Sequence, residues 1–302
     1  MKISYDQGVH YLGDSREVLS EIQDSSVDLV VTDPPYFIDG MGDDWNADQL
    51  QKSSSKASII GGRPVGMKFS KTQGREFEVF MAEISAQLLR VLKPGGFFIS
   101  FSQARLYHRL AVAAEDAGFE IRDMLAWHHN GQAKAFSQVH FIKRMKNLSD
   151  DTKIRLSNEM AHLKTAQLKP QLEPMILAQK PKEGTLVENW VKYGVGLMDS
   201  RQSLDLDFPG NLMKVGKPGK VERGEGNTHL TVKPVTLLEH LIRLFSQEGQ
   251  VVLDPFLGSG STSVSAVKSG RRFVGIERDP NYFQISNRRL EQALSDQGQR
   301  LF

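Results

Sequence analysis

Short apolar runs alternate with segments of helical spacing along most of the chain. Apolar runs of strand length, bounded by turn residues, occupy residues 9–12, 27–32, 97–101, 120–127, 250–253 and 272–276. Apolar residues recur at helical spacing in residues 15–22, 78–92, 104–117, 234–245, 261–268 and 281–294. Strands that alternate with helices in this way predict an α/β fold with a doubly wound, mostly parallel sheet.

The alternation breaks in two places. Residues 37–74 are rich in Gly, Ser and Lys, which predicts a long loop. A compact domain seldom contains so long a loop unless the loop has a function. Residues 129–227 are basic, contain many Pro and Gly, and hold few long periodic segments. We therefore predict an α/β domain built from residues 1–128 and 229–302, with a separate insertion at residues 129–228. Within the domain, Ser15 is expected to cap the first helix.

Charge is distributed unevenly along the chain. The formal net charge is +2, but residues 51–75 hold six basic residues and no acidic residue. Residues 131–182 hold ten basic residues against four acidic ones, so the rest of the chain is net acidic. Basic segments of this kind favour binding to a polyanion. A solvated basic loop is the alternative for either segment taken alone.

Cysteine is absent from the sequence. Its absence excludes disulfides, thiolate metal sites and every reaction that begins with attack by a cysteine. His128 and His129 are neighbours on a predicted strand and face opposite sides, so we expect no metal. No apolar run approaches the ~20 residues that cross a bilayer, and the N-terminal residues lack the apolar stretch of a secretory signal. We expect a cytoplasmic protein.

A predicted strand and a predicted helix are joined by the segment Asp254-Pro255-Phe256-Leu257-Gly258-Ser259-Gly260-Ser261. Glycines let the backbone approach a ligand, and the helix N-terminus favours a negative group. Glu277 ends the next strand, 17 residues after Gly260, near the ~20-residue offset at which an acid meets ribose hydroxyls. Ser263 stands where dinucleotide-binding loops have a third glycine. The segment predicts a nucleoside cofactor rather than NAD or FAD; a tight turn is the alternative.

A second polar segment, Asp33-Pro34-Pro35-Tyr36, follows the buried run at residues 27–32. An exocyclic base amine is a poor nucleophile because its lone pair is delocalised into the ring. The Asp33 carboxylate and the Pro34 carbonyl can accept its two N–H bonds and free that lone pair for attack. Tyr36 offers a ring on which a flipped base could stack. A proline-rich turn with a capping Asp is the alternative interpretation.

The two segments together resemble the amino-methylating DNA methyltransferases of the permuted beta class, which act on adenine N6 or cytosine N4. In this class Asp-Pro-Pro-Tyr precedes the glycine-containing loop. The resemblance covers most of the chain and rests on seven motifs. They are Leu12-Gly13-Asp14-Ser15, residues 32–36, residues 92–96, Lys169-Pro170 with Glu173-Pro174, Tyr193-Gly194-Val195-Gly196, residues 229–234 and residues 253–262.

The resemblance implies a Rossmann-like class I methyltransferase fold, S-adenosylmethionine as cofactor, duplex DNA as substrate and a target-recognition role for the insertion. It also implies a homodimer and a cognate restriction endonuclease within a restriction-modification system. The catalytic residues would be Asp33, Pro34, Pro35 and Tyr36. The cofactor-binding residues would be Asp14, Thr231, Lys233, Asp254, Phe256, Gly258, Gly260, Ser261 and Glu277. At the family's His-Pro-Thr this chain has His229-Leu230-Thr231, and the alternative role for Asp14 is a helix cap.

The target base is predicted from Asp33. Members that modify cytosine N4 often carry Ser at this position, and a carboxylate is the stronger acceptor for an amine proton, so adenine N6 is favoured. Cytosine N4 is the nearest alternative, followed by an RNA or protein amine and by a catalytically idle DNA-binding protein. Cytosine C5 is excluded because its activation requires a cysteine thiolate. Transfer is therefore expected to be direct.

The basic loop generates a prediction about DNA binding. We assign phosphate contacts to Lys52, Lys56, Lys68 and Lys71. Replacing all four by Ala should weaken DNA binding at every sequence, because phosphate contacts carry no sequence information. The slope of log affinity against log salt should fall by roughly one for each phosphate that is no longer neutralised. Titrations at several salt concentrations measure this slope, and an unchanged slope would make the loop a solvated surface.

Overall fold

The structure is a computed structural model that describes residues 1–36, 71–131, 133, 135–204, 208–224, 226–227, 229 and 231–299. Within these residues nine strands form one sheet: β1 Lys2–Tyr5, β2 Gly8–Leu12, β3 Val27–Thr32, β4 Leu92–Phe101, β5 Glu120–His128, β6 Leu172–Gln179, β7 Leu212–Lys214, β8 Val251–Asp254 and β9 Arg272–Glu277. The helices are α1 Ser15–Glu21, α3 Lys71–Val91, α4 Tyr107–Asp116, α5 Val139–Arg144, α6 Asp150–Glu159, α7 Leu186–Tyr193, α8 Lys220–Arg223, α9 Val235–Phe245, α10 Ser261–Lys268 and α11 Pro280–Gln299. In this part of the chain, none of the helices is both long and apolar enough to cross a membrane.

The strand order is β1-β2-β9-β8-β3-β4-β6-β5-β7. Five neighbouring strands, β2, β9, β8, β3 and β4, run parallel to one another. β6 pairs antiparallel with both β4 and β5, and β1 pairs antiparallel with β2. The mostly parallel α/β fold predicted from the alternating pattern is therefore confirmed. Strands from both ends of the sequence form its centre, because β8 and β9 lie between β2 and β3.

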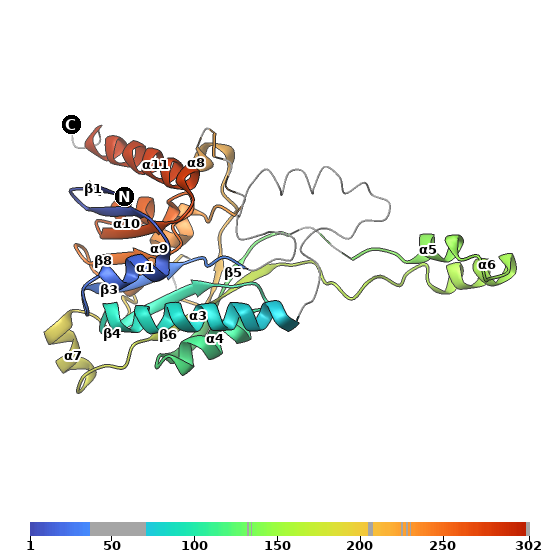
Figure 1. Cartoon of the computed structure of the whole chain (residues 1–302), viewed down its shortest axis with the longest axis horizontal. Coiled ribbons are helices and arrows are strands. Elements are labelled where there is room, and N and C mark those ends of the chain that lie inside the picture. The colour runs from blue at the N-terminus through green and yellow to red at the C-terminus, as the bar shows by residue number, and fades with distance from the viewer. Residues whose placement is uncertain are drawn as a thin grey trace.

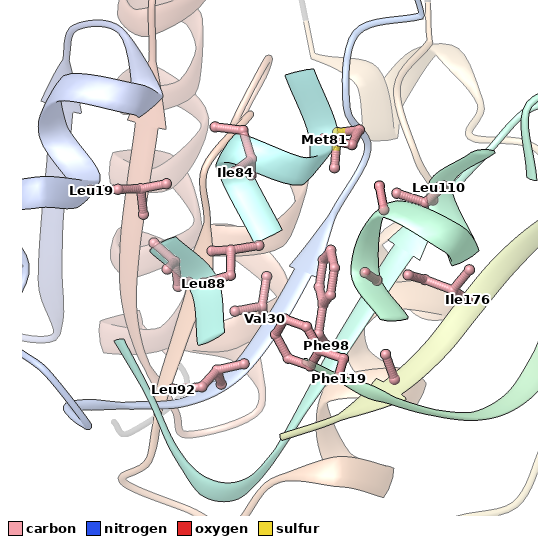
Figure 2. Packing of buried hydrophobic residues seen from close by; sticks show 14 of the residues in the cluster. Leu19, Val30, Met81, Ile84, Leu88, Leu92, Phe98, Leu110, Phe119 and Ile176 are labelled. Atoms are coloured by element: carbon pink, nitrogen blue, oxygen red, sulfur yellow. The ribbon is translucent and has the colours of Figure 1, made fainter. Parts of the chain in front are cut away.

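Helices cover both faces of the sheet (Figure 1). Side chains alternate between the faces along each strand, so Val30 and Phe98 pack against α1, α3 and α4 while Leu29 and Val31 pack against α9 and α10. Figure 2 shows Val30 and Phe98 pointing toward Ile84 and Leu88 of α3 and toward Leu110 of α4. A sheet buried on both faces explains why its central strands are continuous apolar runs.

Three predicted boundaries are wrong. α3 begins at Lys71 rather than near residue 78, because Phe77 and Met81 are fully buried and their packing keeps the turns before them helical despite Gly74. β4 begins at Leu92 rather than at residue 97, since Leu92 pairs with Val27 of β3. The cap of α1 is Asp14 and not Ser15.

The predicted insertion is only partly separate from the sheet. Its residues 172–179 form β6, which lies between β4 and β5 and has Met175 and Ile176 fully buried. Pro170 and Pro174 interrupt the apolar pattern here, and the prediction of a separate segment is wrong for this strand. Helices α5 and α6 pack against each other in an arm that extends away from the sheet (Figure 1). A recognition role for residues 129–228 stays a prediction.

Candidate active site

The candidate site lies at one edge of the sheet. β2, β3, β8 and β9 are parallel neighbours, so their carboxyl ends meet at this edge. Each of them ends at or just before an acidic residue: Asp14, Asp33, Asp254 and Glu277 respectively. All four line a cavity of about 840 Å³. The topology thus brings together two segments that lie more than 200 residues apart in the sequence.

Asp254 holds the glycine-containing segment in place. Its Oδ1 accepts hydrogen bonds from Thr32 Oγ1 at 2.6 Å and from the Phe256 N–H at 3.0 Å. Only 4% of Asp254 is exposed, and burial raises the pKa of its carboxyl to about 6. Thr32 comes directly before Asp33, so this hydrogen bond fixes the two predicted segments against each other.

Gly258 and Gly260 are both required by the local backbone. Gly258 has φ +54°, and a Cβ there would lie 2.8 Å from Nε2 of His229. Gly260 has φ +82°, and a Cβ there would lie 2.9 Å from Cβ of Ser286 on α11. Gly258 lines the cavity, whereas Gly260 is outside its lining and begins α10. Gly260 therefore permits close helix packing, and its predicted contact with a cofactor stays a prediction.

Glu277 presents a carboxylate fixed by two backbone N–H groups. Its Oε2 accepts from Gly258 N at 2.7 Å and its Oε1 from Asp279 N at 2.8 Å. Burial raises the pKa of Glu277 to about 7, although these two hydrogen bonds act in the opposite direction. The charge of this cavity residue therefore changes near neutral pH.

Asp14 serves as the N-cap of α1. Its Oδ1 accepts from Arg16 N at 2.9 Å, and the Arg16 guanidinium binds both carboxylate oxygens. These hydrogen bonds from Arg16 lower the pKa of Asp14. The side chain also lines the cavity, so the capping alternative is observed, and a contact with adenine remains a prediction.

Both carboxylate oxygens of Asp33 have hydrogen-bond donors. Oδ1 accepts from Tyr36 Oη at 2.7 Å, and Oδ2 accepts from Lys233 Nζ at 2.5 Å. Tyr36 is only 8% exposed, and its ring packs 6.2 Å from that of Phe77. Burial raises the pKa of Tyr36 well above its usual value, so the phenol is a donor. Its observed contact is with Asp33, and stacking on a base stays a prediction.

Lys233 bridges two acids. Besides Asp33, its Nζ contacts Glu173 Oε1 at 2.9 Å and lies 4.9 Å from the centre of the Phe101 ring. Its side chain is 8% exposed and that of Glu173 is 21% exposed. Burial lowers the pKa of Lys233, but Asp33 and Glu173 raise it by more, so the ammonium stays charged. Lys233 lines the cavity, and the contacts observed for its ammonium are with Asp33 and Glu173, so a contact with the cofactor stays a prediction.

This chain matches the DNA methylase family designated N6_N4_Mtase over residues 27–288. The chain belongs to this family. Its members are amino-methyltransferases specific for N6 of adenine or N4 of cytosine, and they depend on S-adenosylmethionine. The protein is thus an S-adenosylmethionine-dependent DNA methyltransferase, and the predicted family and cofactor are confirmed.

Individual relatives support membership of the same family. The chain is 29% identical to the Type II methyltransferase M.HindIII of Haemophilus influenzae, covering 93% of this chain and 94% of that one. It is 28% identical to M2.DpnII of Streptococcus pneumoniae, covering 92% and 87%. Among solved structures, the cytosine-N4-specific PvuII DNA methyltransferase has a TM-score of 0.62 at 17% identity, covering 97% and 92%. The M1.HpyAVI complex with SAM has a TM-score of 0.55 at 20% identity, covering 93% and 98%. These structures share the fold.

Most of the predicted site residues of this DNA methylase lie at one cavity. The lining includes Asp14, Asp33, Pro34, Pro35, Tyr36, Thr231, Lys233, Asp254, Phe256, Gly258, Ser261 and Glu277. Of the predicted DNA-binding lysines, Lys52, Lys56 and Lys68 lie outside the described residues, and Lys71 is described only as the start of α3. No group of three or more potential ligand residues for a metal ion occurs within the part of the chain that the structure describes.

Two residues of the site were missed by the sequence analysis. Glu173 belongs to a recognised motif, but nothing in the sequence indicated that it pairs with Lys233, 60 residues away. His229 lines the cavity beside Gly258, with its ring 4.6 Å from that of Tyr282. Burial lowers the pKa of His229 to about 4, so the imidazole is neutral at physiological pH. Its place in the motif at residues 229–234 was the only available signal.

Proposed function

We propose that this DNA methyltransferase modifies N6 of adenine at specific sites in duplex DNA, after the target base has left the helix. One observation carries the proposal. The carboxylate of Asp33 lines the same cavity as Glu277 and the glycine-containing segment, and the hydrogen bond from Thr32 to Asp254 fixes these parts against each other. A methyl acceptor bound at Asp33 and a nucleoside bound at Glu277 would therefore occupy the same cavity.

The residues of the cavity fit S-adenosylmethionine. A volume of about 840 Å³ lies within the range of ligand pockets, which is ~300–1,000 Å³. Glu277 offers acceptors for ribose hydroxyls, and Gly258 presents a backbone without a side chain to the ligand. The acidic lining suits the positive charge of a sulfonium. When bound, the cofactor would supply an electrophilic methyl group.

Asp33 would then prepare the acceptor amine. Its carboxylate accepts one N–H bond of the amine, and the adjoining Pro34 carbonyl accepts the other, which withdraws the lone pair from the ring. Tyr36 orients the carboxylate through Oδ1. Asp33 is also the group placed to receive the proton that the amine loses. The two partners of this carboxylate pack against aromatic rings, Tyr36 against Phe77 and Lys233 against Phe101.

Duplex DNA as the substrate is supported by exposed lysines in one segment, of which Lys217 lies near the site. Lys214, Lys217 and Lys220 are exposed in the segment that leads from β7 to α8. Lys217 is close enough to lower the pKa of both His129 and Glu173. Exposed lysines next to a base-binding cavity suit contacts with phosphates that flank a flipped nucleotide. A recognition role for residues 129–228, a homodimer and a cognate endonuclease belong to the same proposal.

Cytosine N4 is the second candidate. Its amine also carries two N–H bonds beside a ring nitrogen, so Asp33 and Pro34 could polarise it in the same way. The PvuII enzyme, which shares the fold, is cytosine-N4-specific. Adenine is favoured because this position holds Asp33, whereas cytosine-N4 enzymes often carry a serine there. A carboxylate is a stronger acceptor for an amine proton than a serine hydroxyl.

The modified base tests the proposal directly. Duplex DNA of random sequence is incubated with the protein and S-adenosylmethionine, digested to nucleosides and separated by mass spectrometry. N6-methyladenine is the expected product. N4-methylcytosine without methyladenine would replace the first candidate by the second. Parallel incubation with RNA of the same sequence should yield no methylated base.

Removing the carboxylate of Asp33 should separate catalysis from cofactor binding. Asp33→Ala should lower methyl transfer by a factor of ~10²–10³, the usual cost of one polarising group, while S-adenosylmethionine affinity stays nearly unchanged. Calorimetry measures the affinity and transfer of labelled methyl measures the rate. Asp116→Ala, at an exposed carboxylate on α4, is the control. Wild-type turnover of Asp33→Ala would remove Asp33 from the mechanism.

Cofactor affinity should depend on pH through Glu277. The pKa of this carboxyl is about 7 in the free protein, and its ionised form is the stronger acceptor for ribose hydroxyls. Affinity should therefore rise as the pH increases through 7. Glu277→Gln should flatten this dependence and weaken binding at pH 8 by ~1–3 kcal/mol. Calorimetry from pH 6 to 8 measures both effects, with Glu248→Gln at an exposed site as control. An unchanged pH profile in Glu277→Gln would contradict the assignment.

A further inference from the structure

Each oxygen of the Asp33 carboxylate already has one hydrogen-bond donor before any substrate arrives. Tyr36 donates to Oδ1 and Lys233 donates to Oδ2. Each oxygen can accept a second hydrogen bond, but an ammonium bound to Oδ2 makes that oxygen a weaker acceptor for the amine and a weaker base for its proton, so Asp33 polarises the amine best when one of these donors moves aside. Tyr36 packs in the core against Phe77, whereas Lys233 has a second acid within reach. Lys233 is therefore the donor that can move away from Asp33.

Glu173 can keep the Lys233 ammonium paired after Lys233 has left Asp33. Its Oε1 lies 2.9 Å from Lys233 Nζ, and it comes from β6, a strand held between β4 and β5. A buried ammonium without any counter-charge is strongly destabilised. With Glu173 present, Lys233 can release Asp33 and remain paired. One cation shared by two acids is the arrangement that such an exchange requires.

We propose that Glu173 and Lys233 are positioning residues, which hold Asp33 in the free enzyme and release its Oδ2 to the target amine as Lys233 shifts to Glu173. The inference rests on the proposed methylation of a base amine. It assigns to Glu173 a role in the reaction although it need not touch the substrate. It also changes the role of Lys233 from cofactor binding to control of Asp33.

Other charged or titratable groups face this cluster, which we define as Asp33, Lys233 and Glu173. They come from the elements packed around it and are Tyr36, His129, Lys217, His229 and Asp254. Burial lowers the pKa of both His129 and His229, and raises that of Tyr36. The two histidines are therefore neutral above pH 7, and the tyrosine is protonated. Between pH 7 and 9 the cluster's own carboxylates are the groups that the variants below would perturb.

Kinetics of single and double variants provide the first test. Glu173→Gln leaves Asp33 as the only acid for Lys233, so kcat should fall while KM for S-adenosylmethionine stays unchanged. Lys233→Met leaves the half-buried Asp33 and Glu173 without their shared ammonium, so we expect the pKa of the pair to rise and one of the two acids to be protonated at neutral pH. At saturating S-adenosylmethionine, where the pH dependence of cofactor binding through Glu277 does not contribute, its activity should be low at pH 7 and recover toward pH 9. The double variant keeps Asp33 with Tyr36 as its donor but removes both Lys233 and the second acid, and should exceed Lys233→Met at pH 7 by about tenfold, a coupling typical of one ionic network.

Additive effects in the double variant would overturn the inference, as would a wild-type kcat for Glu173→Gln. Weakened S-adenosylmethionine binding in Lys233→Met, unrelieved by Glu173→Gln, would return Lys233 to cofactor binding. Lys93→Met is the matched control. Lys93 pairs with buried Asp28 at 2.6 Å, away from the cavity lining, so its variant should combine additively with Glu173→Gln.

A second readout needs no activity. Acids buried without a cation have raised pKa values in the folded state, so they stabilise the fold at low pH and cease to do so as the pH rises. The Tm of Lys233→Met should therefore fall below that of the double variant progressively between pH 5 and 8. A difference in Tm between Lys233→Met and the double variant that is constant with pH would contradict electrostatic coupling within the cluster. If wild-type protein methylates no base, the proposed function fails, while this Tm series still decides whether the cluster exists.

Discussion

The parallel pairing of β3 with β8 is the constraint on which the site depends. It sets Leu29 beside Val252 and Val30 beside Leu253, so the two strands end at the same edge. The hydrogen bond from Thr32 to Asp254 then joins the residues that lead into each loop. Without this pairing, a catalytic segment near residue 33 and a cofactor segment near residue 258 would have no reason to meet. The permuted order of the motifs is thus compatible with a single cavity.

Buried and half-buried acids gather at the cavity and beside it. Burial raises the pKa of Asp254, Glu277 and Glu173, which means that their ionised forms are disfavoured in the free protein. Such a cost is typical of functional sites. Each acid has a specific compensation: backbone N–H groups for Glu277, the Thr32 hydroxyl for Asp254 and the Lys233 ammonium for Glu173. A cationic, hydroxyl-rich ligand would provide further compensation.

Sequence alone predicted the central sheet well because its signals are local. Strands buried on both faces are continuous apolar runs, and the turns that follow them carry Pro or Gly, so residues such as Asp33, Gly258 and Glu277 could be placed at strand ends. It failed where the signal is long-range. β6 was obscured by Pro170 and Pro174, and only its burial between β4 and β5 makes it a strand. The contacts of Lys233 with Asp33 and Glu173 join residues from three distant segments, and no local pattern encodes such a contact.

The central position of β8 and β9 has a consequence for biogenesis. Both strands are translated after every other strand described, yet as a pair they lie between β2 and β3, which are translated early. A nascent chain that ends at α9 therefore carries β2 and β3 with one unpaired edge each, and such edges promote incorrect association. The sheet therefore cannot be completed strand by strand in the order of translation. Its methyl-donor cavity can form only once residue 277 has left the ribosome, which separates synthesis from the onset of modification.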